Sequence, residues 1–133
     1  MARILIAASP EPSAILRRIL DGHDLVFAAT VEAVEAELHA SPHFDLVVCT
    51  IVFDESRMFD LLRLLKARPD WRDIPFVCAK VRPNLLVSPL ALEAVAFTCR
   101  TLGAAAFIDI AEFETEPERR FRENLERHLR PVA

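Results

Sequence analysis

The residues of this sequence whose types and spacing could support chemistry are concentrated in one stretch, residues 44–66. Two adjacent carboxylates, Asp54 and Glu55, stand in a polar turn there, and such a pair can hold a divalent cation or accept a phosphoryl group. Adjacent acids in a turn more commonly form a solvated loop or cap a helix, and Asp54 lies just before a segment with helical periodicity. We therefore expect Asp54 to cap that helix, with a phosphorylation or metal site as the alternative.

The thiols and imidazoles form no metal-binding or catalytic pattern. Cys49, Cys78 and Cys99 lie inside apolar segments without the paired spacing of a zinc site, which indicates buried, reduced thiols in a cytoplasmic protein. The strand-like surroundings of Cys49 favour an inert sulfur over a reactive one. We expect no metal and no cofactor, and we expect surface positions without a catalytic role for the four scattered histidines, His23, His39, His43 and His128.

Length and composition limit the class of protein. The chain has 133 residues, of which 53% are hydrophobic and 27% charged, and these values predict a single domain over residues 1–133 with a substantial core. The net charge of -4 argues against sequence-independent binding to nucleic acid, which requires a basic surface. No apolar run approaches the roughly 20 residues of a membrane span, and the amino terminus lacks the features of a signal peptide. With only two glycines, a glycine-rich phosphate loop is not expected.

Segments with the composition of buried strands alternate with segments of helical periodicity. Within residues 44–66, Leu46–Cys49 is typical of a strand buried on both faces, and Met58, Leu61 and Leu65 place an apolar stripe on the helix that follows. The alternation predicts an α/β fold in which helices cover both faces of a parallel sheet. The expected strands are residues 3–8, 24–29, 46–49, 74–79 and 105–110.

Capping signals mark where three of the helices should begin. Thr30 can cap the helix after the second strand. Ser88, followed by Pro89 at the first helical position, should start a helix that ends at Gly103. Residues 115–118 have the spacing of a capping box, which should open the last helix.

The order and spacing of these segments resemble the receiver domain of two-component response regulators over nearly the whole chain. The similar segments are the opening strand with its acidic pair, the segment around the phosphorylated aspartate, the fourth strand with its terminal Thr or Ser, and the Lys-Pro region of the fifth strand. In this chain they read RILIAASPEP, FDLVVCTIVFDESRMFDLLRLLK, IPFVCAK and LGAAAFIDIAEF. The resemblance implies a flavodoxin-like three-layer fold with strand order 2-1-3-4-5 and a role in bacterial-type signalling.

The residues that perform phosphoryl transfer in the family are replaced in this chain. The resemblance places the acidic pair on Ala8 and Ser9 and the phospho-acceptor on Thr50. It places the sensing Thr or Ser on Lys80 and the lysine on Ile110. Because loss of one electrostatic contact costs about 10²–10³ in rate, loss of the nucleophile and the metal ligands together predicts no phosphorylation and no enzymatic activity.

Lys80 has two interpretations. Its ammonium can pair with Asp54, Glu55 or Asp109 and so lock one conformation of the domain. Alternatively, Lys80 is a loop lysine whose charge reaches water. We favour the second interpretation, because the long side chain of a lysine at a strand end extends easily into solvent.

The segment between Lys80 and Gly103 predicts an interaction surface. Its helix is apolar nearly all round, whereas a helix that covers one face of a sheet should be polar on its far side, and residues 85–87 before it are apolar too. We expect this helix and the last helix to bind a protein partner or a second copy of the chain. The alternative is that the long preceding segment folds over the helix and buries it. The expected contact residues are Leu92, Val95, Phe97 and Leu102.

These patterns together predict a degenerate receiver, that is, a signalling module that acts by protein contact and does not depend on phosphorylation. Two alternatives stay open. One is an atypical receiver that accepts phosphate on Thr50 or Asp54. The other is a sensor that binds a small ligand in the emptied pocket between Ala8, Thr50 and Lys80, with nucleotides the least expected ligands because glycine is nearly absent.

Overall fold

A single five-stranded parallel sheet organises the computed structural model, which describes residues 2–82 and 87–130. Its order, β2-β1-β3-β4-β5, confirms the predicted flavodoxin-like arrangement. Each strand begins and ends within two residues of the predicted bounds. The strands are β1 (Arg3–Ala7), β2 (Asp24–Ala28), β3 (Leu46–Thr50), β4 (Phe76–Lys80) and β5 (Ala106–Asp109).

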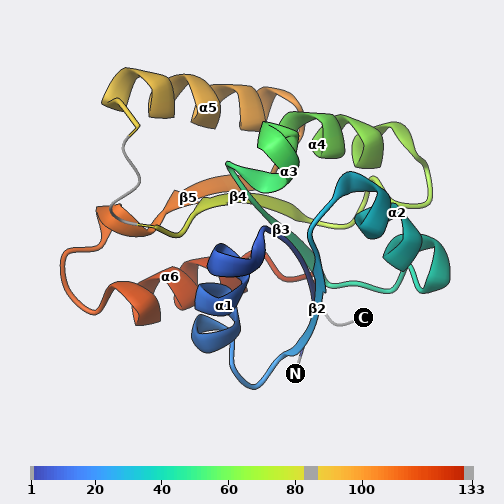
Figure 1. Cartoon of the computed structure of the whole chain (residues 1–133), viewed down its shortest axis with the longest axis horizontal. Helices are drawn as coiled ribbons and strands as arrows, with labels where there is room; N and C mark the ends of the chain where they lie inside the picture. The colour runs from blue at the N-terminus through green and yellow to red at the C-terminus, as the bar shows by residue number, and fades with distance from the viewer. Residues whose placement is uncertain (1, 83–86, 131–133) are drawn as a thin grey trace.

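Helices form a layer on each face of the sheet (Figure 1). The layer of α1 and α6 covers one face, and the layer of α2, α4 and α5 covers the other. Two short elements that the sequence pattern did not predict, α3 and the 3₁₀-helix η1, follow β3 and β5. The bounds are α1 (Pro10–Ile19), α2 (Val31–Ala40), α3 (Phe53–Ser56), α4 (Met58–Ala67), α5 (Pro89–Thr101), η1 (Ile110–Glu112) and α6 (Pro117–Glu126).

The alternation of side chains along the strands divides the core into two parts. In β3, Leu46 and Val48 face the layer of α1 and α6, whereas Val47 and Cys49 face the opposite layer. All four side chains are fully buried, as expected for a central parallel strand. The three cysteines are free and buried, which confirms the predicted burial of these thiols.

Two of the three predicted helix starts are confirmed, and one is wrong. Thr30 Oγ1 accepts a hydrogen bond from the Ala33 amide at 3.0 Å, and Ser88 Oγ accepts one from the Ala91 amide at 3.1 Å. The capping box at residues 115–118 does not form, because α6 starts at Pro117 and its N-cap is Glu116, in a left-handed conformation with φ 47°. A cap at residue 115 would require helical φ and ψ directly before a proline, where the ring disfavours them.

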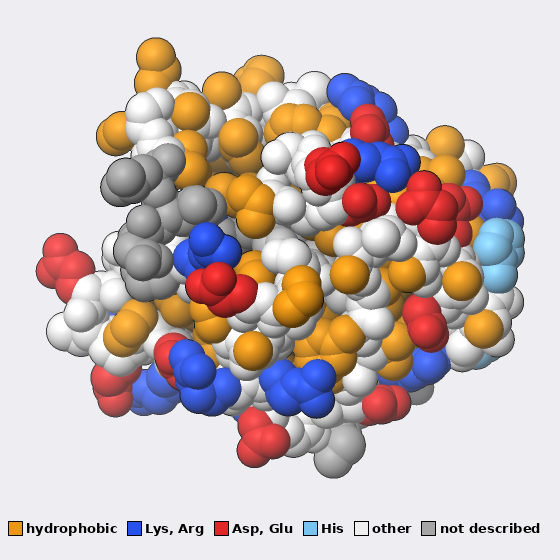
Figure 2. Space-filling model, in the orientation of Figure 1, with side chains coloured by type: hydrophobic (Ala, Val, Ile, Leu, Met, Phe, Trp, Pro, Cys, Tyr) orange, Lys and Arg blue, Asp and Glu red, His pale blue; other side chains and the backbone are white. Residues whose placement is uncertain are grey.

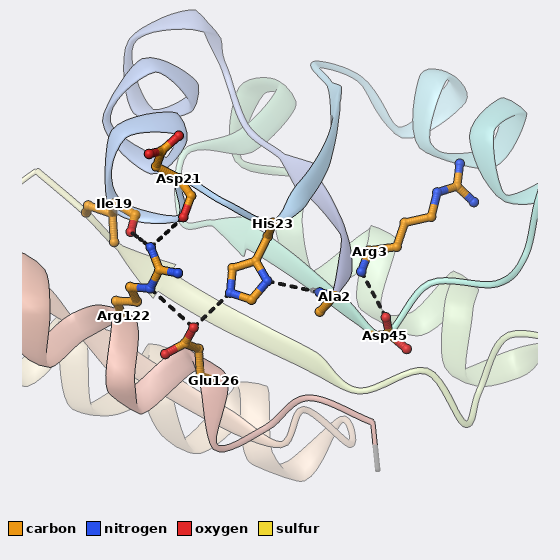
Figure 3. Close-up of polar contacts among 8 residues, drawn as sticks. All are labelled: Ala2, Arg3, Ile19, Asp21, His23, Asp45, Arg122 and Glu126. Atoms are coloured by element: carbon orange, nitrogen blue, oxygen red, sulfur yellow. Dashed lines mark hydrogen bonds and ion pairs between the residues drawn. The ribbon is translucent and has the colours of Figure 1, made fainter. Parts of the chain in front are cut away.

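One histidine departs from its predicted surface position. His23 lies at the start of β2 with its side chain only 10% exposed, inside a polar cluster that joins β2 to α6 (Figure 3). Its Nδ1 accepts a hydrogen bond from the Ala2 amide at 3.1 Å, so its Nε2–H donates to Glu126 at 2.8 Å. Arg122 extends the cluster by donating to the carbonyl oxygens of Ile19 and Asp21 at the end of α1. The prediction failed because this burial comes from α6, 103 residues further along the chain.

The structure bears on two further expectations within the residues that it describes. None of the helices in these ranges is long and apolar enough to cross a membrane. Of the apolar connection at residues 85–87, residues 85 and 86 lie outside the described ranges. Leu90 and Phe97 of α5 are 78% and 67% exposed, so the chain does not bury this helix at those positions.

Candidate functional site

The carboxyl ends of the parallel strands bring the predicted site residues to one edge of the sheet. Ala8 follows β1, Thr50 ends β3, Lys80 ends β4 and Ile110 follows β5. Ser9 occupies the N-cap position of α1 but makes no side-chain capping hydrogen bond. Of these residues, Thr50 and Lys80 line one cavity together. Ala8 and Ile110 line two separate hollows, of about 310 and 360 Å³.

The cavity at Thr50 is very small. It measures about 10 Å³ and is lined partly by Pro12, Thr50, Lys80 and Arg82. This volume admits about one water molecule. The Thr50 hydroxyl is buried there and has no hydrogen-bond partner among residues 2–82 and 87–130. A buried hydroxyl without a partner costs about 1–3 kcal/mol, which a single water donating to Oγ1 would recover.

Lys80 forms a buried ion pair with Asp109. The two residues are register neighbours on β4 and β5, and Nζ lies 3.2 Å from Oδ1, with the side chains 4% and 10% exposed. The same Oδ1 accepts a hydrogen bond from the Ala111 amide at 2.9 Å, which caps η1. The favoured interpretation of Lys80 as a solvated loop lysine is therefore wrong. A lysine held inside the sheet edge requires an acidic partner, and the neighbouring strand supplies Asp109.

Asp54 caps a helix, but not the one that the sequence predicted. Its Oδ2 accepts a hydrogen bond from the Val31 amide at the start of α2 at 2.9 Å, and it pairs with Arg57 at 3.2 Å. The expected cap of the following helix, α4, is wrong. Asp54 and Glu55 lie within α3 and have left-handed backbone angles, with φ 44° and 55°, so this short element is not a regular right-handed helix and does not continue into α4.

A third carboxylate at this edge is also paired. Glu11 of α1 binds Arg82, just after β4, with Oε2 and Nη1 3.2 Å apart, and this pair ties α1 to the segment beside the Thr50 cavity. Glu11, Asp54 and Asp109 are thus each paired with a cation or hydrogen-bonded to a backbone amide. Within residues 2–82 and 87–130, no group of three or more His, Cys, Asp or Glu side chains could hold a metal ion.

The thiol next to Thr50 is not reactive. Burial raises the pKa of Cys49 well above its ordinary range, and the nearby Cys99 raises it further. The thiolate is the nucleophilic form of cysteine, so Cys49 offers no nucleophile at neutral pH. Neither Thr50 nor Cys49 therefore has the properties of an activated acceptor.

The helix α5 presents part of the expected interaction surface. Phe97 is largely exposed, as is Leu90, which is not among the expected contact residues. Val95 and Leu102 are half-buried and pack partly against the core. Leu92 is half-buried too. Figure 2 shows hydrophobic side chains over α5, in the same place as the helix in Figure 1.

Comparison with known proteins gives a consistent fold. No protein-family model matches the sequence, and no curated protein matches it. Among solved structures, the chain is similar to the non-phosphorylated HemR receiver domain from Leptospira biflexa, with 25% identity, a TM-score of 0.68 and 100% of both chains covered.

Two further structures agree. The signal receiver domain of a histidine kinase from Syntrophus aciditrophicus is 22% identical, with a TM-score of 0.73 over 96% of this chain and 89% of that one. The Mn(2+)-bound form of response regulator Rcp1 is 17% identical, with a TM-score of 0.74 over 100% of this chain and 98% of that one. At these identities the likeness establishes the fold.

Proposed function

From the premise that this chain has the fold of the response-regulator receiver domains, we propose that it is a single receiver-like domain over residues 1–133 and a signalling module that works by protein contact without being phosphorylated. The observation that carries the proposal is the state of the carboxyl edge of the sheet. Three of its acids, Glu11, Asp54 and Asp109, are paired with cations or amides, and the cavity at the acceptor position, Thr50, measures about 10 Å³. Phosphoryl transfer relies on a divalent cation and on preorganised positive charge around the transferred group.

The Lys80–Asp109 pair supports a fixed conformation of this edge. Receiver switching, as the resemblance implies it, depends on a group at the end of β4 that responds to the phosphoryl oxygen. Here that position holds an ammonium already bound to the neighbouring strand at 3.2 Å. Breaking a buried ion pair costs about 3–5 kcal/mol, so the pair opposes movement of β4 against β5.

The partner would bind at α5 and α6. The exposed side chains of Leu90 and Phe97 give α5 an apolar contact area. Phe121 and Leu125 anchor α6 in the core, which leaves its charged face outward. An apolar centre beside a charged rim is the usual composition of a protein interface.

The test is incubation with a small phosphodonor and Mg²⁺, followed by intact-mass measurement. We expect no mass increase by a phosphoryl group, whereas a receiver with an intact acidic pair and aspartate, treated in parallel, should show one. A Thr50→Val variant and an Asp54→Asn variant serve as matched controls. A phosphoryl group that appears on the wild type and disappears in one variant would establish the atypical receiver instead.

A ligand sensor is the second candidate, and the two larger hollows favour it. The hollow lined by Ile110 has about 360 Å³ and an apolar lining that includes Ile15 and Phe113, within the range of small-molecule sites. The hollow lined by Ala8 has about 310 Å³. Thermal-shift screening with small apolar acids and metabolites tests this role, because a ligand that binds only the folded chain raises the unfolding midpoint. A raised midpoint that an Ile110→Arg variant abolishes would support it.

A further inference from the structure

A hollow lies between α1 and the end of β2, away from the Thr50 cavity (Figure 1). Its volume of about 310 Å³ is at the lower end of the range of small-molecule sites, so a ligand that fills it is small. Among the described residues, the hollow shares no lining residue with the Thr50 cavity. The lining includes Ala8, Ser13, Ala14, Arg17, Phe27 and Ala29.

One side of α1 forms a wall of this hollow. Pro10, Ser13, Ala14 and Arg17 recur at the spacing i, i+3, i+4 and i+7, so they lie on the same face of the helix. The Ser13 hydroxyl donates a hydrogen bond to the Ala8 carbonyl at 3.2 Å, so its proton is already used. None of the lining residues that the structure describes is acidic, and Arg17 carries a positive charge. The hollow is therefore suited to an anion.

The guanidinium of Arg17 is positioned by Phe27. It lies 4.5 Å from the centroid of the Phe27 ring, in a cation–π contact between α1 and β2. Within residues 2–82 and 87–130, the Arg17 side chain makes no ion pair and no hydrogen bond. Its neighbour Arg18, by contrast, donates two hydrogen bonds to Glu118. The N–H donors of Arg17 are thus available to an anion in the hollow.

We propose that this hollow binds a small aromatic carboxylate, with the carboxylate on Arg17 and the ring against Phe27 and the alanine side chains. A guanidinium can donate two parallel hydrogen bonds to a carboxylate, which fixes the orientation of the ligand. Its ring can then pack edge to face against Phe27. The inference rests on the second candidate role, that of a ligand sensor, and specifies its ligand class.

The rigidity of an aromatic acid distinguishes it from an aliphatic acid of similar size. A flexible chain loses rotational freedom about several bonds when it is bound, whereas an aryl carboxylate has few bonds to immobilise. The ring also matches the wall formed by Phe27. We therefore expect a preference for the aromatic ligand at equal charge.

The site is open to solvent, which limits its affinity. Ala14, Arg17 and Ala29 are all exposed, so a bound ligand stays partly in contact with water. For benzoate as the probe we expect a Kd on the order of 1 mM. Titration with benzoate up to about 20 mM, followed by NMR of the backbone amides, measures this range. The amides of Ser13, Ala14 and Ala29 should shift and reach saturation.

Two variants and one matched control locate the ligand. Arg17→Met removes the cation, and Ala14→Leu fills the hollow while it keeps the cation; we expect each to weaken benzoate binding at least about tenfold. Arg18→Met is the control, because Arg18 is the adjacent arginine and lines the other hollow. It should leave the affinity within about twofold of the wild type. Circular dichroism and thermal melting establish that each variant is folded.

Two further probes test the class of ligand. Benzamide has the shape of benzoate without its charge, and hexanoate has the charge without the ring. We expect both to bind about tenfold more weakly than benzoate. Benzamide binding as tightly as benzoate would overturn the role of Arg17, and hexanoate doing so would overturn the aromatic preference.

The remaining outcomes separate this inference from the proposed function. The absence of saturable shifts up to 20 mM overturns the site, and so does a folded Arg17→Met variant with wild-type affinity. Weaker binding in Arg18→Met alone would place the ligand in the other hollow and overturn it too. The phosphodonor test decides the proposed function by itself. A chain that takes up phosphate and also binds benzoate as described would overturn the proposed function and leave this site standing.

Discussion

Lys80 and Asp109 end neighbouring strands, and their charged groups meet 3.2 Å apart with almost no access to solvent. The pair lies next to the Thr50 cavity, whose lining includes Lys80. Asp109 Oδ1 accepts hydrogen bonds from both the Lys80 ammonium and the Ala111 amide, so this single atom links β4, β5 and η1. These two contacts tie the ends of β4 and β5 to η1.

Removing one member of this pair should destabilise the protein strongly. Lys80→Met leaves the Asp109 carboxylate buried without a cation, and we expect a loss of about 3–5 kcal/mol in the free energy of unfolding. The double variant Lys80→Met with Asp109→Leu removes both charges and should recover most of that loss. Urea unfolding of Lys80→Met, Asp109→Leu and the double variant measures the coupling. Equal losses in the single and double variants would contradict this account.

Replacing the Thr50 hydroxyl should cost little. Because Oγ1 has no partner in the structure, Thr50→Val removes an unsatisfied polar atom while it keeps the shape of the side chain, and we expect a change between zero and about 1 kcal/mol of stabilisation. Thr50→Asp, which places a carboxylate at the same buried position, should destabilise the protein instead. Chemical denaturation of both variants gives the comparison, and a strongly destabilised Thr50→Val protein would reveal an unseen hydrogen bond.

The capping role of Asp54 can be separated from any role in phosphorylation. Asp54→Ala leaves the Val31 amide at the start of α2 without its acceptor, and we expect a loss of about 1 kcal/mol in the free energy of unfolding. Glu55→Ala changes the exposed neighbouring acid and should have almost no effect. Equilibrium unfolding of both proteins checks the difference. Similar losses in the two variants would argue against capping.

The ion pair between Arg18 and Glu118 should make stability depend on acid pH. The hydrogen bond from Arg18 lowers the pKa of Glu118 below its ordinary value, so the folded state favours the ionised carboxylate. This contribution is complete above the ordinary glutamate pKa of about 4.3 and is lost as the pH falls through the lower folded-state pKa. The stability difference between wild type and Glu118→Gln should therefore shrink between pH 6 and pH 3. The effect should be small, because both side chains are well exposed.

The three thiols should be protected in the folded protein. Cys49, Cys78 and Cys99 are fully buried. Burial raises the pKa of Cys49, and a hydrogen bond with Cys99 together with burial raises the pKa of Cys78. We expect no reaction with a disulfide reagent such as DTNB under native conditions and complete reaction of three thiols in denaturant. Rapid reaction of one thiol in the folded state would show that the core opens around it.

Much of the fold could be predicted from the sequence because the relevant signals are local. The spacing of Met58, Leu61 and Leu65 predicts α4, and the apolar run from Leu46 predicts β3, without any knowledge of their neighbours. The identities of Thr50 and Ile110 at the key positions also led to the prediction that the chain does not take up phosphate, which the phosphodonor experiment tests. A side chain without a carboxylate or an amine cannot supply one in any fold.

The tertiary structure decided which groups meet, since those contacts join residues far apart in the sequence. Lys80 and Asp109 are 29 positions apart, and Asp54 and the amide that it caps are 23 apart. No periodicity encodes such a pairing, because it depends on how neighbouring strands align and how the loop after β3 bends. The exposed side of α5 was likewise fixed by packing. A helix that is apolar nearly all round gives little pattern from which to read its buried face. The packing of Cys99, Val95 and Leu102 against the core leaves Phe97 exposed.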